Sequence, residues 1–475
     1  MDSIEQRRLD DSMTFVQQRR LYEGLPSLLK VPFAWVPFAV LAGKRYRSTL
    51  RETARLDAAS RDDVLAYQER ALGEMLRFAC DQVPAYQQFR AAVERLRPFD
   101  ALKTFPFLDK KSLQEDLSRY VPRDIERLPH WECTTAGTSG NQLRIYLDDH
   151  SHAEEMAFMH HQWARVGYRP WCRKATFRGV LFPNLRPGQY WQSNPVYHEI
   201  QFSPFHMGEQ TLGAYVDQLR RFRPHFMHGY PSAIALLADF VNRHGIDLSG
   251  LSLKALLLAS EALLPGQRDA MQAAFGCRVF SWYGHSERLL LAGECEHTSV
   301  YHHFPNYGIL EIVDEDGNLV REDGGRGELV GTALLNHSLP LIRYRTEDFA
   351  RWRSHQCECG RNFDRFDEVE GRWKQEYLIG KNGARISLSA LNLHEPLFNE
   401  VIRYQYYQDT PGVAEVRLLA TGRFSQADAS ALRHAFLRRA GTELTIILRI
   451  VDDIPLTVRG KLRRLIQEIP TEPAP

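Results

Sequence analysis

Apolar residues recur at helical spacing in the first part of the chain. Between residues 62 and 80 the apolar positions lie about one helical turn apart, which predicts an amphipathic helix. These positions are Val64, Leu65, Leu72, Met75, Leu76 and Phe78. Residues 83–86, with Pro84, mark the end of this helix, and Asp109 followed by two lysines indicates the start of another. We therefore predict a mainly helical region over residues 1–130.

From residue 131 to about residue 350, helical and strand-like segments alternate. The spacing of apolar residues predicts helices over 152–167, 215–222, 232–244 and 265–275, the last with Pro265 near its first turn. Short apolar segments between them predict strands over 175–182, 253–258 and 278–283. Such alternation is typical of a layered α/β fold.

The pattern changes after residue 300. Segments 308–313, 327–332 and 349–353 predict a β-rich section, with a hairpin turn at 314–318. Beyond a boundary near 370–372 we expect a small α+β unit, with strands at 414–419 and 444–451, a helix at 426–440, a loop at 455–461 and a helix at 462–467. The predicted fold class is α/β plus α+β. A large domain has a helical part (1–130) and a core (131–371), and a small, mobile C-terminal domain spans 372–475.

Composition narrows the functional classes. The chain has 475 residues, 44% of them hydrophobic and 25% charged, and its net charge of +1 argues against nucleic acid as a partner. Its start lacks the pattern of a secretory signal. The longest apolar run, 31–42, is shorter than the ~20 residues that span a bilayer and contains two prolines. We expect it to form a packed loop or short core helix, with surface attachment as the alternative.

Seven cysteines in a chain without a secretory signal favour reduced thiols and a cytoplasmic location.

The loop at 134–140 reads Thr-Thr-Ala-Gly-Thr-Ser-Gly. Its glycines allow close approach of the backbone, and its N–H and O–H groups suit phosphate oxygens. It is not a Walker A loop, because no Gly-Lys-Ser/Thr follows. A plain turn between two strands is the alternative.

Four further motifs carry candidate chemistry. Tyr283-Gly284-His285-Ser286-Glu287 follows a predicted strand and suits a crevice that stacks a base and holds Mg²⁺. In the segment 344–348, Asp348 could accept both hydroxyls of a ribose. The segment 371–374 suits a hinge, and Lys461 on a glycine-bearing loop could neutralise charge on a phosphate. Taken singly, each motif also fits an ordinary turn, surface loop or linker.

In this order, the five motifs resemble those of the adenylate-forming superfamily of acyl-CoA synthetases, luciferases and nonribosomal adenylation domains. The resemblance covers residues from about 131 to 465. Within the superfamily the chain is similar to the phenylacetate–CoA ligase branch, especially its capsular polysaccharide biosynthesis relatives. This narrower similarity rests on the helical N-terminal region, the short C-terminal domain and the segments 83–86, 229–232 and 357–361.

The resemblance implies a role for each matching position. The phosphates of ATP would lie against Thr135, Gly137, Thr138, Ser139 and Gly140. The rest of the nucleotide site would comprise Ser260, Glu261, Ala262, Tyr283, Gly284 and Ser286, with Asp348 on the ribose. Glu287 would hold Mg²⁺, Arg372 would assist near the ribose or phosphate, Lys374 would be the hinge and Lys461 the adenylation lysine. His228, Gly229 and Tyr230 would line the acceptor-substrate pocket.

Two positions depart from the family pattern. The phosphate loop continues with Gln142 and Leu143 after Asn141, where the family usually has a lysine. The usual Tyr-Arg-Thr-Gly-Asp has Glu347 in place of its glycine. The residues most needed for adenylation, Glu287, Asp348 and Lys461, are retained.

Four residues could form a zinc site. Cys295, His302, Cys357 and Cys359 provide three thiolates and one imidazole, an acceptable tetrahedral set. Some relatives in the branch are similar in carrying such ligands. His297 and His303 compete with His302 for the fourth position, and the alternative is a set of reduced thiols without metal.

The expected activity is that of an ATP-dependent ligase. A carboxylic acid would be activated as acyl-adenylate with release of pyrophosphate, and the acyl group would pass to coenzyme A or to an amine. The cofactors would be ATP and Mg²⁺, with coenzyme A and structural zinc as further candidates, and the enzyme would be a monomer or homodimer. The alternative is a degenerate adenylation fold that binds a nucleotide or polysaccharide precursor without ligating it.

Overall fold

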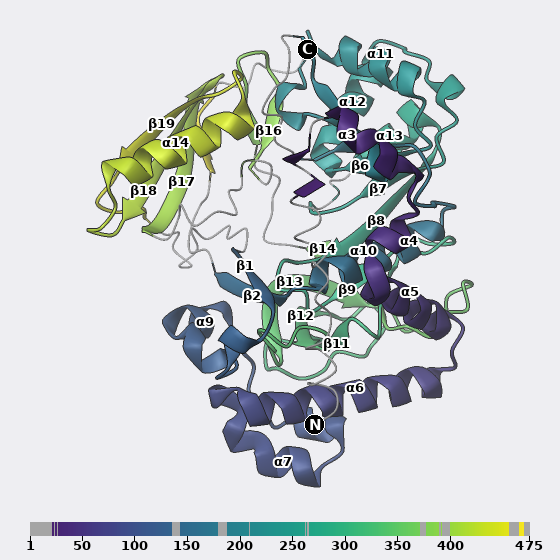
Figure 1. Ribbon diagram of the computed structural model, residues 1–475, viewed down its shortest axis with the longest axis vertical. Helices are drawn as coiled ribbons and strands as arrows, with labels where there is room; N and C mark the ends of the chain where they lie inside the picture. The colour runs from purple at the N-terminus through teal and green to yellow at the C-terminus, as the bar shows by residue number, and fades with distance from the viewer. Residues whose placement is uncertain are drawn as a thin grey trace.

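Figure 1 shows a computed structural model of the chain. The structure describes residues 21–22, 24–25, 27–134, 143–178, 188–208, 210–261, 263, 266–370, 377–388, 391, 400–455 and 465–469. Within these residues, helices dominate the N-terminal part, a large sheet occupies the middle of the chain, and a separate smaller sheet follows near the C-terminus (Figure 1).

The N-terminal region is helical, as predicted. Its main helices are α5 (Gly43–Asp57), α6 (Arg61–Gln82), α7 (Arg90–Arg95), α8 (Pro98–Leu102) and α9 (Lys110–Glu115). The hydroxyl of Ser60 caps α6 by accepting from the backbone N–H of Asp63, and Asp109 caps α9 in the same way. The apolar face of α6 packs into a core with α8, and Leu72 and Leu76 are fully buried there.

The apolar run 31–42 forms two short helices, η2 (Val31–Trp35) and α4 (Phe38–Leu41). Only Phe38 and Ala42 of this run are buried. Trp35 is 86% exposed and Val40 is 62% exposed. The expectation of a packed segment is therefore wrong for most of its side chains. Among the described helices, none combines the length and the hydropathy needed to cross a bilayer.

A twelve-stranded sheet forms the centre of the molecule. One half is mainly parallel, with strand order β8-β7-β6-β3-β5 and β4 antiparallel at the edge. Its strands are β3 (Lys174–Phe177), β4 (Trp191–Asn194), β5 (Glu199–Phe202), β6 (Phe226–Gly229), β7 (Ala255–Leu258) and β8 (Arg278–Gly284). The other half is antiparallel, with order β9-β10-β14-β13-β12-β11. Its strands are β9 (Leu291–Gly293), β10 (Tyr301–His303), β11 (Gly308–Val313), β12 (Arg326–Ala333), β13 (Tyr344–Trp352) and β14 (Arg365–Glu370).

Helices cover both faces of the parallel half. On one face, alternate residues such as Phe177, Met227 and Leu256 join a core with α11 (Leu212–Phe222), α12 (Pro231–Arg243) and α13 (Gln267–Phe275). On the other face, Phe226 and Leu257 pack with α10 (Ser151–Ala164). Helices on both faces of a mostly parallel sheet define the layered α/β architecture that the alternation predicts.

Several boundaries differ from the prediction. The strand expected over 175–182 is β3 and ends at Phe177, while the last residues of that range lie outside the described part of the chain. Helix α13 begins at Gln267 after Gly266, and Pro265 also lies outside the described residues. The segment 344–348 belongs to β13 itself instead of joining two strands. Its pairing with β12 is interrupted by a bulge, which hides the alternation of a strand in the sequence.

The C-terminal region is α+β, as predicted. Four strands pair in the order β19-β18-β17-β20, with helix α14 (Gln426–Ala440) against them. The strands are β17 (Val401–Thr410), β18 (Val413–Ala420), β19 (Thr445–Ile450) and β20 (Leu465–Gln467). A helix over 462–467 is wrong for the residues that are described there, because Leu465–Gln467 pairs in parallel with β17. Strand pairing overrides local helical preference at this position.

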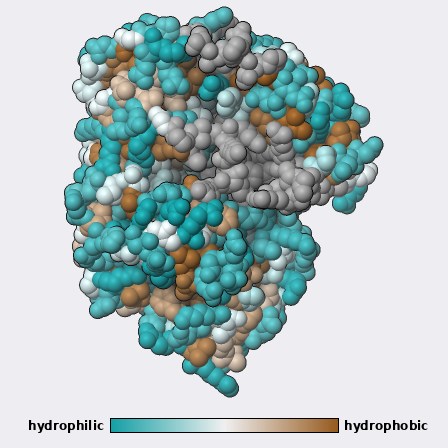
Figure 2. All heavy atoms as spheres, turned by 180° about the vertical axis from the view of Figure 1, so that it is seen from behind, coloured by the Kyte–Doolittle hydropathy of each residue, from teal (hydrophilic) through white to brown (hydrophobic). Residues whose placement is uncertain are grey.

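The C-terminal sheet packs against the large domain (Figure 1). Phe205, from the large domain, is buried in the core of the C-terminal unit. The hairpin of β15 (Tyr377–Ile379) and β16 (Arg385–Ser387) lies beside it. A cavity of 300 Å³ lies between the two parts and is lined by residues that include Leu212, Asp239 and Asn382. Seen from behind, the described surface is mostly hydrophilic, with apolar atoms in scattered patches (Figure 2).

Candidate functional site

A tyrosine and an aspartate from two distant strands meet at one end of the large sheet. The hydroxyl of Tyr283, near the end of β8, donates to Oδ2 of Asp348 on β13 at 2.9 Å. Three strands, β9, β10 and β14, separate β8 from β13 in the sheet order, so the contact requires the sheet to curl. Burial and the neighbouring Asp348 raise the pKa of Tyr283 well above its usual range. The phenol therefore stays protonated and holds the carboxylate as its acceptor.

The backbone around Asp348 is fixed by local hydrogen bonds. Its N–H donates to the hydroxyl of Thr346 at 3.1 Å, and that hydroxyl donates to the carbonyl of Leu329 at 2.7 Å. Between them, Glu347 has a φ of 60°, in the left-handed region. Glycine adopts this conformation without strain, which explains why the family pattern has glycine where this chain has glutamate. The fold accommodates Glu347, with its N–H bound to Glu328 at 2.9 Å.

Glu287 is a partly buried carboxylate with polar partners. His285 accepts from the N–H of Leu290 through Nε2, so its Nδ1 carries the proton and donates to Glu287 at 3.2 Å. The hydroxyl of Tyr344 lies 3.5 Å from its other oxygen. Burial opposes ionisation, but the hydrogen bond from His285 and the charge of Lys110 lower the pKa of Glu287 below its usual range. Glu287 therefore offers an ionised carboxylate, and Mg²⁺ prefers oxygen ligands of this kind.

Ser260 and Glu261 follow the end of β7. Ser260 has a φ of 71°, an uncommon conformation for a residue with a side chain. Oε2 of Glu261 accepts from the N–H of Ser232 at 3.0 Å and so satisfies a free donor in the first turn of α12.

His228, Gly229 and Tyr230 lie at the end of the neighbouring strand, β6. A Cβ on Gly229 would lie 2.4 Å from the carbonyl oxygen of Phe177, so only glycine fits this approach of β3 to β6. His228 is 5% exposed, and its Nδ1 lies 2.7 Å from the carbonyl of Leu257. Burial, assisted by Arg178, lowers the pKa of His228 well below its usual range. His228 is thus neutral, with Nδ1 as donor and Nε2 as acceptor.

The remaining predicted nucleotide-site residues divide into two groups. Gly284 ends β8, where a Cβ would lie 2.7 Å from the ring of Trp282, and Ser286 is partly exposed between His285 and Glu287. The others lie outside the described residues: Thr135, Gly137, Thr138, Ser139, Gly140, Ala262, Arg372, Lys374 and Lys461. The strands that flank the phosphate loop, β1 (His130–Thr134) and β2 (Arg144–Asp148), pair as an antiparallel hairpin.

The sequence analysis assigns no site role to two cationic residues that lie near the site. Lys110, at the start of α9, adds to the effect of His285 in lowering the pKa of Glu287. Arg178 follows β3 directly and donates to the hydroxyl of Ser260 at 3.0 Å. The sequence analysis expects this strand to continue to residue 182, which would place Arg178 within the sheet. Because β3 ends at Phe177, Arg178 lies instead at the end of the sheet, where a site residue is expected.

The pair His160 and His161 has a structural role. Nδ1 of His160 lies 2.8 Å from the hydroxyl of Tyr46 in a buried aromatic cluster, and His161 pairs with Asp57 at 2.9 Å. Both therefore connect α10 to α5.

The four predicted zinc ligands lie together. One candidate ligand atom from each of Cys295, His302, Cys357 and Cys359 lies within 4.8 Å of all the others. Sγ of Cys295 is 3.6 Å from Sγ of Cys357, and Sγ of Cys359 is 3.3 Å from Nε2 of His302. A tetrahedral zinc with Zn–S bonds of about 2.3 Å has S–S edges of roughly 3.8 Å, so the donor set fits the metal.

The fold orients these ligands. Strand β10, which carries His302, pairs with β14, which follows the two later cysteines. Nδ1 of His302 lies 3.0 Å from the carbonyl of Val300, which leaves Nε2 free to bind metal. The two competing histidines are not in the cluster. His297 pairs with Glu358 at 3.6 Å, and His303 is buried elsewhere on the strand.

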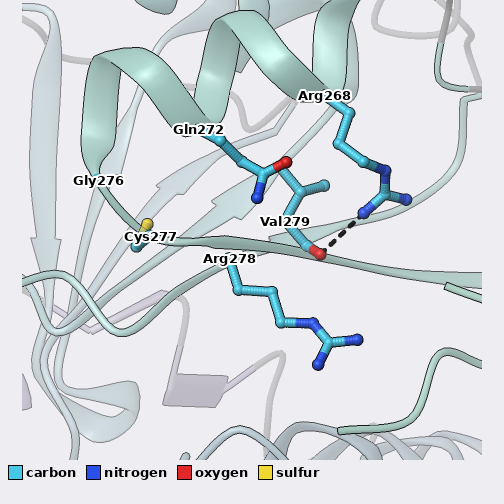
Figure 3. Close-up of a pocket in the computed structure, with 6 residues that line it drawn as sticks. All are labelled: Arg268, Gln272, Gly276, Cys277, Arg278 and Val279. Atoms are coloured by element: carbon cyan, nitrogen blue, oxygen red, sulfur yellow. Dashed lines mark hydrogen bonds between the residues drawn. The ribbon is translucent and has the colours of Figure 1, made fainter. Parts of the chain in front are cut away.

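The cavity in Figure 3 lies at the opposite end of β8 from Tyr283. It measures 520 Å³ and is lined by Arg268, Gln272, Gly276, Cys277, Arg278 and Val279 (Figure 3). Arg268 donates to the carbonyl of Val279 and pairs with Glu294. Arg278 donates to the carbonyls of Cys295, Glu296 and Thr298. Both arginines therefore support the chain around Cys295.

The chain is similar to known proteins in sequence and in fold. Residues 378–468 match the family model described as the CapK C-terminal domain. Protein CapK of Staphylococcus aureus is 21% identical over 78% of this chain and 80% of its own length. The phenylacetate-coenzyme A ligase of Thermus thermophilus is 24% identical over 86% of this chain and 98% of its own. The solved structure of a 2-hydroxyisobutyryl-CoA ligase in the postadenylation state shares the fold, with a TM-score of 0.55, 18% identity and coverage of 87% and 91%.

These matches confirm the resemblance to the adenylate-forming superfamily and to its phenylacetate–CoA ligase-like branch. The fold class is that of adenylate-forming ligases, with a large layered α/β part and a C-terminal domain.

Proposed function

We propose that this chain is an ATP-dependent, AMP-forming ligase. It activates a carboxylic acid as an acyl-adenylate, releases pyrophosphate and passes the acyl group to the thiol of coenzyme A. The observation that carries the proposal is the grouping of Tyr283, Asp348 and an ionised Glu287 at one end of β8. This grouping occurs on a fold shared with a CoA ligase, at the positions where the family motifs would hold the nucleotide.

The described residues suggest how ATP is oriented. The hydroxyl of Tyr283 donates to Oδ2 of Asp348. A carboxylate can accept several hydrogen bonds, so that of Asp348 could also accept from the two ribose hydroxyls. Glu287 is held ionised by His285 and Lys110 and would ligate Mg²⁺. When bound, Mg²⁺ supplies positive charge that offsets the developing charge on the phosphates.

Four elements outside the described residues complete the proposal. The loop of Thr135, Gly137, Thr138, Ser139 and Gly140 would enclose the phosphates, although the lysine that usually follows is absent. Lys461 would then be the main protein cation near the α-phosphate, and Arg372 would assist. Lys374 would be the hinge about which the domain of residues 372–475 rotates between adenylation and acyl transfer.

We also propose a structural zinc ion at Cys295, His302, Cys357 and Cys359. The support is that the four donor atoms lie within 4.8 Å of one another and that Nε2 of His302 is directed toward the cysteines. A structural ion of this kind would join the chain after β9 to the connection between β13 and β14. Without metal, the same four residues would be three reduced thiols and an imidazole in contact.

Coenzyme A is the acceptor that the relatives favour, because the names of two of them include it. An amine acceptor is the second candidate, because the family model that matches residues 378–468 names no acceptor. The competing proposal is a fold that binds a nucleotide without ligation, and its support is the missing lysine in the phosphate loop.

ATP–pyrophosphate exchange across a panel of carboxylic acids tests the proposal. Exchange that depends on an acid supports adenylation. Nucleotide binding without acid-dependent exchange supports the competing proposal. Product analysis with coenzyme A and with amines then identifies the acceptor.

A further inference from the structure

Arg178 lies where the ends of three neighbouring parallel strands meet. It follows β3 directly, beside the carboxyl end of β6 with His228 and Tyr230 and near Ser260, two residues beyond β7. In open α/β sheets, ligands bind outside the carboxyl ends of the strands. Arg178 therefore occupies the edge of the sheet where a substrate is expected.

The contacts of its guanidinium in the described part of the chain are to uncharged groups. Nη2 donates to the hydroxyl of Ser260 at 3.0 Å, and Nη1 lies 3.4 Å from Nε2 of His228. The guanidinium carbon lies 5.4 Å from the centre of the Tyr230 ring. Because Nδ1 of His228 donates to the carbonyl of Leu257, its Nε2 can only accept, and the imidazole holds Arg178 as a neutral acceptor.

A cation on β3 itself behaves differently. Lys174, the first residue of the strand, lies four residues before Arg178 and is 4% exposed. It forms an ion pair with Glu199 at 3.3 Å, and Glu199 also accepts from Thr176 at 2.8 Å. The inner cation is thus neutralised by a carboxylate, whereas Arg178 is held in place by polar groups that do not neutralise it.

A positioned guanidinium has the geometry to bind a carboxylate or phosphate through two parallel hydrogen bonds. The two terminal nitrogens of Arg178 contact His228 and Ser260. Each of these nitrogens carries a second N–H that could bind a ligand. A partly buried guanidinium also favours a ligand that brings negative charge.

We propose that Arg178 sets substrate specificity by binding a second anionic group on the acid that is activated. The substrate class is then an acid that carries a further carboxylate or phosphate. This inference rests on the proposed adenylation function and deepens it. His228 and Ser260 act as positioning residues, because they fix Arg178 without a charge of their own.

The test uses matched pairs of acids in ATP–pyrophosphate exchange. Each dicarboxylate from malonate to suberate is compared with its own monoamide, and phosphonate analogues distinguish a second carboxylate from a phosphate. The wild type is expected to prefer the dianion of the best pair by about 10–100-fold in kcat/KM, the range for a charge-assisted hydrogen-bonded contact. Arg178→Met should remove this preference, and Arg178→Lys should restore part of it.

Arg173→Met is the matched control, because Arg173 precedes the same strand and donates to the carbonyl of Arg223 at the far end. It should retain the wild-type preference. The proposal is overturned if the wild type does not discriminate within any pair, or if Arg178→Met lowers both members of each pair equally. The second result would assign Arg178 a structural or general binding role and leave adenylation standing.

A separate measurement covers failure of the proposed function. If no acid supports exchange in the wild type, calorimetric titration of the same pairs tests the anion site directly. Dianion binding that disappears in Arg178→Met supports the site without adenylation. Equal heats for dianion and monoamide in the wild type would remove the anion site as well.

Discussion

The hydroxyl of Tyr283 and Oδ2 of Asp348 lie 2.9 Å apart, although their strands are separated by three others in the sheet. Hydrogen bonds to charged groups contribute about 1.5–3 kcal/mol. We therefore expect Tyr283→Phe to weaken ATP use by roughly 10–100-fold in kcat/KM for ATP, the equivalent of that energy. Tyr407→Phe is the matched control, because Tyr407 donates to Glu468 in the C-terminal sheet. Equal effects of the two substitutions would show that Tyr283 does not orient the Asp348 carboxylate that is proposed to bind the ribose.

The left-handed conformation of Glu347 leads to a stability prediction. At a φ of 60°, a residue with a side chain is strained by about 1–2 kcal/mol, and glycine in the unfolded chain costs about 0.4–1 kcal/mol in entropy. Glu347→Gly should thus stabilise the protein by up to about 1.6 kcal/mol in urea unfolding, whereas Glu347→Val should destabilise it. Glu347→Gln isolates the effect of charge. A glycine variant less stable than the glutamine variant would contradict the strain argument.

Asp148 provides a pH-dependent test of the large domain. It is 4% exposed and accepts hydrogen bonds from the N–H and hydroxyl of Ser338 and from the N–H of His337. Burial raises its pKa, but the bonds and charges around it outweigh burial and place its folded pKa well below the usual aspartate value of 3.8. Its contribution to stability is therefore complete above that value and is lost as the pH falls toward the folded pKa.

The expected measurement is the difference in unfolding free energy between wild type and Asp148→Asn. This difference should be large near pH 6 and shrink as the pH falls below about 4. Asp316→Asn, in an exposed turn, should show little difference at either pH. A wild-type advantage that grows on acidification would contradict the lowered pKa.

The zinc proposal predicts which histidine matters. Purified protein should contain about one zinc per chain by elemental analysis after dialysis against a weak chelator. His302→Ala should lose the metal, whereas His297→Ala should keep it, because His297 points to Glu358. Loss of one ligand should also lower the midpoint of thermal unfolding, since the metal would join the chain after β9 to the connection between β13 and β14. Absence of zinc from the wild type would contradict the proposal.

Some of the fold follows directly from local signals. Helix α14 begins and ends where the sequence predicts, because Ser425 and Asp428 form a capping box and Gly441 follows its last residue. The order of helices and strands over the parallel half follows from the same local periodicity.

Other features depend on tertiary pairing. The choice of His302 over His303 depends on the register between β10 and β14, which no local pattern contains. Strand β20 forms where the sequence favours a helix, because β17 offers a pairing edge. Arg178 becomes a candidate only once β3 is known to end at Phe177. The motif order predicts which residues hold the nucleotide, but the contact between Tyr283 and Asp348 depends on the curl of the sheet, which no motif contains.

Trapping of the activated acid by hydroxylamine tests the central claim most directly. With ATP, Mg²⁺ and an acid from the panel, wild-type protein should form the hydroxamate. Lys461→Ala should form it about 10²–10³-fold more slowly, the loss expected for one charge-stabilising donor in a transition state. Lys381→Ala, on the turn between β15 and β16, is the matched control and should resemble the wild type. Hydroxamate formation at the wild-type rate in Lys461→Ala would contradict the role of that lysine, and no acid-dependent hydroxamate in the wild type would contradict adenylation itself.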